Sequence, residues 1–310
     1  MQTQPAMVPL DDTMLPSVLE LIAAALPHSR VQEGRLRQLY SGPHASSTEA
    51  TVALADGRAV GFVTAIYKTA PDGRPDSDAG YVTALAVDPD YERSSLGTDL
   101  LARAENYLKS RGLVRVLATA FPGFYFFPGI DVRYAFLTDL FTRAGFRVRG
   151  EPVDMKVTWE QYEPPSWLQE AETSVARQGL VIDHARQEHH AAFVNFMEKH
   201  FPGPWCERAK AHMASGEDLD RAVLVLDGKD VVGFVRFGAS GDRGSIDSIG
   251  VRPDMRGKKL GSVLLARALQ GMANRGATMG YFGYTGAIRF YETVGAQVIR
   301  RYYQFGKELA

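Results

Sequence analysis

A short turn in the second half of the chain carries the residue types best suited to bind an anion. It reads Arg256-Gly-Lys-Lys-Leu-Gly261 and lies between a predicted strand and a predicted helix. At such a junction the free N–H groups of the first helical turn point outward at the positive end of the helix dipole, a geometry that suits pyrophosphate. Arg256, Lys258 and Lys259 add charges that can pair with phosphate oxygens. An ordinary glycine turn with solvated basic side chains is the alternative, and the turn alone does not decide between them.

Other catalytic patterns are absent from the sequence. Neither G-x-x-x-x-G-K-[ST] nor G-x-G-x-x-G occurs, and there is no G-x-S-x-G elbow of a serine hydrolase. His189 and His190 are adjacent on a predicted helix, so they point about 100° apart and do not share an ion easily; with His184 they have no metal-ligand spacing. Cys206 is the single cysteine, which excludes an internal disulfide and a multi-cysteine zinc site. We expect no metal.

The basic turn belongs to a segment that occurs twice. Val87-Asp-Pro-Asp-Tyr-Glu-Arg-Ser-Ser-Leu-Gly97 aligns with Val251-Arg-Pro-Asp-Met-Arg-Gly-Lys-Lys-Leu-Gly261, an offset of 164 residues. At the same offset, Leu100-Leu-Ala-Arg-Ala104 recurs identically as Leu264-Leu-Ala-Arg-Ala268. We infer a tandem duplication.

The elements that position these residues follow the same order in both halves. In the first half we expect a strand at 7–10, a helix at about 12–26, an Asp-Gly hairpin within 54–63, a strand at 81–87 and a helix at about 96–111. In the second half the matching ranges are 180–183, about 187–200, 226–235, 245–251 and about 260–275. Each half then ends with a strand, a helix that stops near Gly145 or Gly295, and a closing strand. This order predicts an α/β fold in which each half forms a mixed sheet with helices on both faces.

Chain length indicates the number of domains, and the charge balance indicates the kind of partner. A chain of 310 residues is about twice the length of one compact domain, and we expect domains at 1–159 and 176–310 with a linker at 160–175 around Pro164-Pro165. Lys and Arg total 35 against 36 for Asp and Glu, a balance that disfavours a nucleic-acid partner. The apolar stretch at 17–26 is too short to span a bilayer and lacks a signal-peptide pattern, so we expect a cytoplasmic protein with no membrane partner.

One insertion distinguishes the halves. The helix-ending glycines, Gly145 and Gly295, are 150 residues apart, so the first half carries 14 extra residues before that point. The extra residues centre on the aromatic run Phe121-Pro-Gly-Phe-Tyr-Phe-Phe-Pro-Gly-Ile-Asp131. We expect an ordered loop with apolar anchors that packs against the domain instead of forming a binding platform.

Together with a later segment, the turn resembles a known family. The helix that contains Leu264-Leu265 is followed by Ala287-Ile-Arg-Phe-Tyr291-Glu-Thr-Val-Gly295-Ala296. In this order the motifs resemble those of the GNAT superfamily of N-acetyltransferases, whose members hold the pyrophosphate of acetyl-CoA with an Arg/Gln-x-x-Gly-x-Gly/Ala turn and carry a later Ala-x-x-x-Tyr-x-x-x-Gly-Phe segment. The resemblance covers about 180–310 well and about 5–158 more weakly. It implies two GNAT domains in tandem, each with a mixed, mostly antiparallel sheet.

The resemblance also implies a co-substrate site in the second half. It assigns acetyl-CoA as the acetyl donor and CoA as a product, with no metal. The residues it places against acetyl-CoA are Ile249, Val251, Arg256, Gly257, Lys258, Lys259, Leu260, Gly261 and Ser262. The chain departs from the family pattern at three positions: Lys259 stands for the first glycine, Ala296 for Phe, and Tyr284 for the Asn that many members have there.

The family reaction is direct attack of an amine on the thioester carbonyl, and it needs proton transfers and a polarised carbonyl. By resemblance, Tyr291 is the general acid toward the CoA sulfur and the backbone N–H near Val251 polarises the carbonyl. Asp247 is the candidate general base, because it lies on the strand that the resemblance suggests splays open; an ordered water chain is the alternative. Gly250 in the same strand is compatible with a bulge or a close ligand approach.

The first half departs further from the family pattern. Glu92 stands at the Arg/Gln position, where a carboxylate repels pyrophosphate although Arg93 partly offsets it. Phe141 stands where the second half has Tyr291, and a phenyl ring has no proton to donate. We expect the first half to be a degenerate, non-catalytic copy that shapes the substrate cleft.

The acceptor is open at this stage. The expected substrate is a primary amine of a small molecule or peptide, with a mycothiol-synthase-like enzyme acting on a thiol-sugar amine as one alternative. A non-catalytic acyl-CoA sensor or scaffold is the other. Trp205 and Cys206 are expected in the loop after the first helix of the second half, where Trp205 lines the acceptor pocket and Cys206 packs. We expect a monomer or a homodimer.

Overall fold

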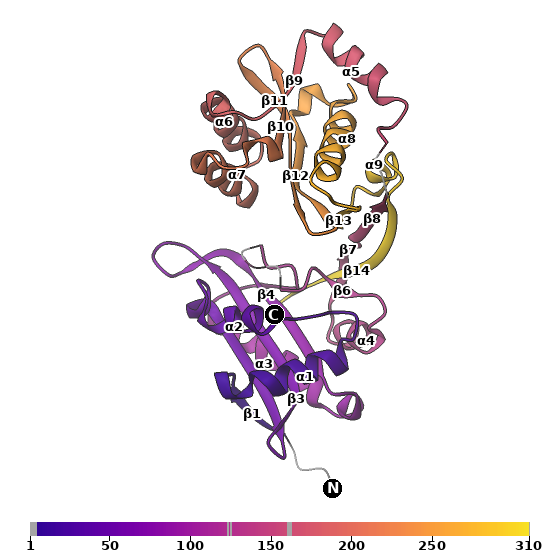
Figure 1. Ribbon diagram of the computed structural model, residues 1–310. Coiled ribbons are helices and arrows are strands. Elements are labelled where there is room, and N and C mark those ends of the chain that lie inside the picture. The colour runs from indigo at the N-terminus through magenta and orange to yellow at the C-terminus, as the bar shows by residue number, and fades with distance from the viewer. Residues whose placement is uncertain (1–4, 123, 125, 160–162, 310) are drawn as a thin grey trace. The chain divides into compact units, whose positions relative to one another are not determined.

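The chain folds into two compact units that do not coincide with the halves of the sequence. A computed structural model describes residues 5–122, 124, 126–159 and 163–309. Unit 1 consists of residues 1–152 and 301–310, and unit 2 of residues 153–300. Each unit is built around its own β-sheet (Figure 1). The expected division into 1–159 and 176–310 follows the sequence repeat, whereas these units follow the contacts.

Unit 2 holds a mixed, mostly antiparallel sheet. Its strands lie in the order β9-β10-β11-β12-β13-β8, and only β12 and β13 pair in parallel. The strands are β9 (Leu180–His184), β10 (Ala222–Asp227), β11 (Asp230–Ser240), β12 (Arg243–Val251), β13 (Met279–Thr285) and β8 (Val153–Thr158). The short Asp227–Asp230 turn between β10 and β11 is the Asp-Gly hairpin that the sequence predicts.

Helices cover both faces of this sheet, as expected, and alternate strand residues form two separate cores. Leu224 and Phe234 point toward α6 (His190–His200) and α7 (Pro204–Ser215). Val223 and Val235 point toward α8 (Leu260–Ala273) on the other face (Figure 1). A short helix, α9, spans Ile288–Glu292. A strand that is apolar on both sides must be covered on both sides, so this alternation determines the three-layer arrangement.

Unit 1 repeats the same plan. Its sheet order is β1-β2-β3-β4-β5-β14, with β4 and β5 the parallel pair and β6 and β7 paired to β14. The strands are β1 (Ala6–Pro9), β2 (Thr48–Ala55), β3 (Arg58–Thr69), β4 (Pro75–Val87), β5 (Arg115–Ala118), β6 (Ile130–Asp131), β7 (Arg147–Gly150) and β14 (Gln297–Glu308). The helices are α1 (Leu15–Ala25), α2 (Glu33–Ser41), α3 (Leu96–Ser110) and α4 (Ala135–Arg143).

The closing strands of the two repeats are exchanged. In unit 2, Met155 of β8 pairs with Phe282 of β13. In unit 1, Phe305 of β14 pairs with Ala118 of β5. Met155 and Phe305 hold matching positions in the repeat, as do Ala118 and Phe282, so each unit is completed by the closing strand of the other repeat.

The structure also contains helices that the sequence analysis missed. Residues 160–162 of the expected linker lie outside the described residues, but Leu168–Arg177 forms α5, whose apolar side is buried in the core of unit 2. The expectation that Trp205 and Cys206 lie in a loop is wrong: both lie in α7, which begins at Pro204, where the missing N–H costs nothing. Cys206 is nevertheless a buried packing residue, and burial raises the pKa of its thiol.

The inserted run of unit 1 packs as predicted where it is described. Residues 123 and 125 lie outside the described residues. Phe121, Phe126 and Phe127 are buried, and Ile130 begins β6. The ring of Phe127 contacts Phe126 edge to face. The loop therefore adds side chains to the core of unit 1.

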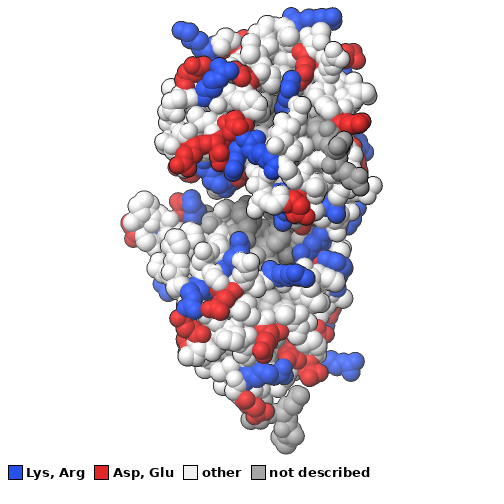
Figure 2. Space-filling view, viewed as in Figure 1, with Lys and Arg blue, Asp and Glu red and all other residues white. Residues whose placement is uncertain are grey.

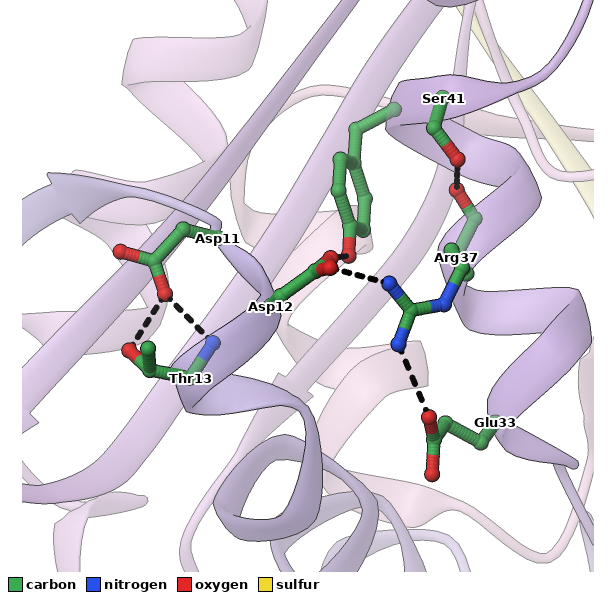
Figure 3. Close-up of polar contacts among 7 residues, drawn as sticks. Asp11, Asp12, Thr13, Glu33, Arg37 and Ser41 are labelled. Carbon is green, nitrogen blue, oxygen red and sulfur yellow. Dashed lines mark hydrogen bonds and ion pairs between the residues drawn. The ribbon is translucent and has the colours of Figure 1, made fainter.

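A polar network ties the start of unit 1 to α2 (Figure 3). The Asp12 carboxylate accepts hydrogen bonds from the Tyr40 hydroxyl and the Arg37 guanidinium. Arg37 also donates to Glu33, one helical turn earlier (3.0 Å). The bond to Tyr40, followed by that to Arg37, lowers the pKa of Asp12, while burial and the same bond raise the pKa of Tyr40 to about 12.

Acidic and basic side chains alternate over the face of each unit seen in Figure 2, in line with the balanced composition. Within the described residues, no helix is both long enough and apolar enough to cross a bilayer.

Candidate functional site

Unit 2 contains a cavity of about 890 Å³ that opens between β12, β13 and the start of α8. Ten of the eleven site residues that the sequence analysis named line it. They are Asp247, Ile249, Val251, Arg256, Gly257, Lys259, Leu260, Gly261, Ser262 and Tyr291. Lys258 is the exception, because its ammonium lies 3.4 Å from the sulfur of Met255.

The cavity exists because β12 and β13 separate. Their parallel pairing is limited to Arg243–Ser245 against Met279–Tyr281. Opposite Arg236 and Phe237 the register of β12 shifts, so Asp247 is left without a partner in the ladder, which is a β-bulge. The expected splayed strand is therefore present, and its bulge falls at Asp247.

Gly250 is required by packing instead of by the bulge. A Cβ atom there would lie 2.4 Å from the Phe201 ring and 2.9 Å from the Phe234 ring. Phe201 in turn stacks on Trp205 (6.1 Å between centroids), which is 39% exposed and lines the cavity. The expectation that Trp205 lies at the cavity wall agrees with the structure.

The basic turn presents free donors to the cavity. Gly257 has φ +80°, Lys259 has φ +62°, and α8 begins at Leu260. Within the described residues, none of the backbone N–H groups from 257 to 262 donates to a protein acceptor. Together with Arg256 and Lys259, these N–H groups form a positive surface at the positive end of the α8 dipole.

The same turn in unit 1 is closed by its own side chains. The Leu96 N–H donates to the Ser94 hydroxyl (3.2 Å), and the Ser95 hydroxyl donates to the Asp99 carboxylate (2.8 Å). Asp99 occupies the position of Val263, so together with Glu92 it places two carboxylates at the end of the helix where a phosphate would bind. A dianion is repelled here, since like charges oppose its approach.

The interior of unit 1 is also filled. In unit 1 the space next to Phe141, the counterpart of Tyr291, is about 20 Å³. Phe127 and Ile130 of the insertion also line it. A larger hollow of about 340 Å³ is lined by Val87 and Glu92, the counterparts of Val251 and Arg256, and by Arg133. Among the described residues, the space next to Tyr291 in unit 2 thus belongs to a cavity of about 890 Å³, whereas the space next to Phe141 in unit 1 is about 20 Å³.

Tyr291 is placed on the cavity wall by aromatic packing. Its ring stacks on Phe282 (4.4 Å, 20° between planes) and meets Phe290 edge to face. The side chain is 7% exposed, and no hydrogen bond of its hydroxyl to another described residue is present. Burial raises the pKa of this phenol, so it stays protonated at neutral pH and can donate a proton.

Asp247 also lines the cavity, but its carboxylate is held in two ion pairs. Its two oxygens accept from Arg208 (2.9 Å) and Arg236 (2.7 Å). Arg236 is 13% exposed at its side chain, and this burial lowers the pKa of the guanidinium. Both oxygens of Asp247 are thus engaged by guanidinium groups, whereas a general base needs an oxygen that can reach the substrate amine, so this geometry weighs against the role of general base.

Sequence reasoning did not assign the segment that ends β13. Phe282, Gly283, Tyr284 and Thr285 line the cavity, and the register of β13 shifts between Phe282 and Thr285. Tyr284 has φ +52°, an uncommon conformation for an aromatic residue. The one signal in the sequence was that Tyr284 replaces the asparagine of many family members.

The residues present fit acetyl-CoA, the co-substrate that the resemblance implies. The free N–H groups and the two cations suit its pyrophosphate, and the volume of the cavity falls in the range of small-molecule sites. The described residues contain no group of three His, Cys, Asp or Glu side chains able to hold a metal ion.

Solved structures that share this fold include proteins described as GCN5-related N-acetyltransferases. Three similar solved structures are the glucosamine N-acetyltransferase region of a fungal multi-domain GH3 beta-N-acetylglucosaminidase (18% identity, 98% of this chain and 38% of that chain, TM-score 0.81), a GCN5-related N-acetyltransferase from Sphaerobacter thermophilus (21%, 99% and 97%, 0.73) and a tandem GNAT protein from the clavulanic acid biosynthesis pathway (13%, 98% and 98%, 0.63). This chain thus spans less than two fifths of the fungal one. At these identities the likeness shows the fold.

The family itself is shown by a sequence model. The model of the acetyltransferase (GNAT) family matches residues 15–123 and 190–296, one region in each repeat. No curated protein matches the chain. With two matching regions and the tandem architecture along its whole length, the chain belongs to the GNAT acetyltransferase family as a tandem of two GNAT domains.

Proposed function

We propose that this protein is an acetyl-CoA-dependent N-acetyltransferase whose single active site lies in unit 2, and that its acceptor is a primary amine. The observation that carries the proposal is the pairing of an open phosphate-binding turn with a buried, protonated Tyr291 on one cavity. In unit 1 the turn is closed and the tyrosine is replaced by Phe141.

The turn and the separated strands bind different parts of acetyl-CoA. The N–H groups of 257–262, with Arg256 and Lys259, bind the pyrophosphate. Ile249 and Val251 border the space into which the thioester arm extends, and the backbone N–H near Val251 polarises the thioester carbonyl. Acetyl-CoA supplies the acetyl group as an activated thioester.

In the transfer, the amine nitrogen forms a bond to the acetyl carbon and the carbon–sulfur bond breaks. Tyr291 donates its phenolic proton to the departing sulfur, because burial keeps that proton in place at neutral pH. The amine proton leaves through ordered water. Asp247 anchors the acceptor end of the cavity as part of the Arg208–Asp247–Arg236 cluster.

The first test measures release of CoA from acetyl-CoA with a panel of amines. The panel includes glucosamine, because one similar structure carries that substrate in its name, and also a thiol-sugar amine, amino acids and peptides. Tight binding of acetyl-CoA with no turnover of any amine would favour a non-catalytic sensor.

The second test changes the proposed acid. We expect Tyr291→Phe to lower kcat about 100-fold or more, since general acid catalysis is worth that much, and to leave the Kd of CoA within about twofold. Tyr303→Phe in unit 1 is the matched control and should behave as wild type. An unchanged kcat in Tyr291→Phe removes Tyr291 from the mechanism.

A further inference from the structure

A buried carboxylate lies behind the cavity wall of unit 2 without lining the cavity. Asp154 is the second residue of β8, it is 4% exposed, and its neighbours Val153 and Met155 are fully buried. A buried carboxylate is costly unless hydrogen-bond donors surround it. The groups that donate hydrogen bonds to Asp154 therefore indicate which part of the fold this carboxylate stabilises.

Two of the groups that donate to Asp154 belong to the segment that ends β13. The backbone N–H of Tyr284 donates to Asp154 Oδ1 (2.9 Å), and the Tyr281 hydroxyl donates to the same carboxylate. The Tyr281 ring is fixed in turn by the Arg243 guanidinium, which lies 3.7 Å from the ring centroid. Asp154 thus clamps the four residues 281–284 at both ends.

The clamped segment carries two elements of the cavity wall. Tyr284 is held at φ +52° and lines the cavity, and Phe282 is the ring on which Tyr291 stacks. A left-handed backbone at a non-glycine residue is strained and persists only where the surroundings impose it. The bond from Tyr284 N–H to Asp154 imposes it here.

Unit 1 contains the corresponding bulge with a different support. Ala120, the counterpart of Tyr284, has φ +56°, and its N–H donates to the carbonyl of Phe127 in the insertion (3.0 Å). Gln304 holds the repeat position of Asp154. A carboxylate clamp therefore accompanies the copy that has Tyr291, and an inserted loop replaces it in the copy that has Phe141.

We propose that Asp154 is a positioning residue of the acetyltransferase site: by clamping residues 281–284 it places Tyr284 and the support of Tyr291 at the cavity wall. This inference rests on the proposed function for its kinetic consequence but not for its structural one. A strand from the end of the first repeat thereby supplies a site residue to the second.

The structural consequence is tested without turnover. The protein is labelled with 3-fluorotyrosine, and its ¹⁹F resonances from Tyr284 and Tyr291 are assigned with Tyr284→Phe and Tyr291→Phe. We expect Asp154→Ala to shift both resonances. Asp154→Asn keeps an oxygen for the Tyr284 N–H and should retain them, as should Lys156→Ala, a control two residues along the same strand. Unshifted resonances in Asp154→Ala would overturn the proposal.

The kinetic consequence separates positioning from binding. We expect Asp154→Ala to lower kcat about 10- to 100-fold, the cost of misplacing a reacting group, with the KM for acetyl-CoA within about twofold. Asp154→Asn should recover most of kcat. A wild-type kcat in Asp154→Ala, or a loss confined to KM, contradicts the proposal.

Misfolding of Asp154→Ala and absence of turnover in the wild-type protein have different consequences for the proposal. Should Asp154→Ala fail to fold, Tyr281→Phe replaces it, because that change removes one donor and leaves the ring; it should move the same resonances in the same direction, and no movement would contradict the clamp. Should wild-type protein turn over no amine, the proposed function fails and the ¹⁹F comparison alone decides whether Asp154 positions the wall.

Discussion

At the scale of single residues, the two copies differ at the atoms that would touch pyrophosphate and sulfur. Arg256 and Tyr291 line the cavity of unit 2, and their counterparts in unit 1 are Glu92 and Phe141. These identities were readable from the sequence, because the repeat aligns them. The ion pairs of Asp247 were not, since Arg208 and Arg236 are brought to it only by α7 and β11.

Charge reversal at the two turns should have unequal effects on the Kd of CoA. We expect Arg256→Glu to weaken binding of CoA about 10-fold or more, because it removes a charge-assisted hydrogen bond and adds repulsion. Arg93→Glu, the matched change beside the turn of unit 1, should leave the Kd unchanged. Calorimetric titration with CoA measures both, and equal losses would mean that unit 1 also binds CoA.

The raised pKa of Tyr291 makes a prediction about pH. A general acid is active while protonated, and a pKa above the ordinary value of about 10 keeps the phenol protonated to higher pH. We therefore expect kcat to show no descending limb from Tyr291 below about pH 10. A descending limb between pH 8 and 9 that disappears in Tyr291→Phe would show that the phenol is more acidic than its burial implies.

At the scale of elements, the periodic segments were predicted well and the aperiodic ones were not. The strand predicted at 245–251 lies within β12, and the helix predicted at about 260–275 corresponds to α8, which ends at Ala273. The linker predicted at 160–175 overlaps α5, because Pro164-Pro165 indicates an irregular segment. The apolar residues of α5 are explained only by their packing in the core that also contains α8. Similarly, no local pattern marks the bulge that Asp154 supports.

The start of α8 offers a test of how strain and charge combine. Lys259 has φ +62°, where glycine is favoured by about 1 kcal/mol, whereas Lys258 is not in that region. We expect Lys259→Gly to raise the free energy of unfolding by about that amount and Lys258→Gly to lower it slightly. Urea denaturation measures both. A loss of stability in Lys259→Gly would show that the lysine side chain stabilises the turn more than its backbone strains it.

At the scale of the whole molecule, the exchanged strands make the units differ from the sequence repeats. Alignment of the repeats reveals two domains but gives no sign that β8 pairs with β13, or that β14 pairs with β5. The reason is physical: residues 153–155 and 303–305 share the same apolar–polar–apolar pattern, so the pattern does not indicate which sheet each strand joins. Pairing partners are decided by the connections, which a local pattern does not encode.

This exchange predicts which fragments fold. A fragment of residues 153–300 retains β8 and should be monomeric with a cooperative thermal transition. A fragment of residues 176–310 lacks β8, leaves the edge of β13 open and carries an unpaired end of β14, so it should aggregate. Gel filtration and circular dichroism compare them. Equal cooperativity in the two fragments would show that β8 is dispensable for unit 2.

The route of β14 also has a consequence for biosynthesis. Residues 1–152 of unit 1 are synthesised before unit 2, yet β14, the strand that pairs with β5, is synthesised after it. All of unit 2 is synthesised while β5 still lacks its partner strand, so unit 1 completes its sheet only after unit 2 has been made. A premature stop codon within β14 would therefore damage the unit that contains residues 1–152, far from the lesion in the gene.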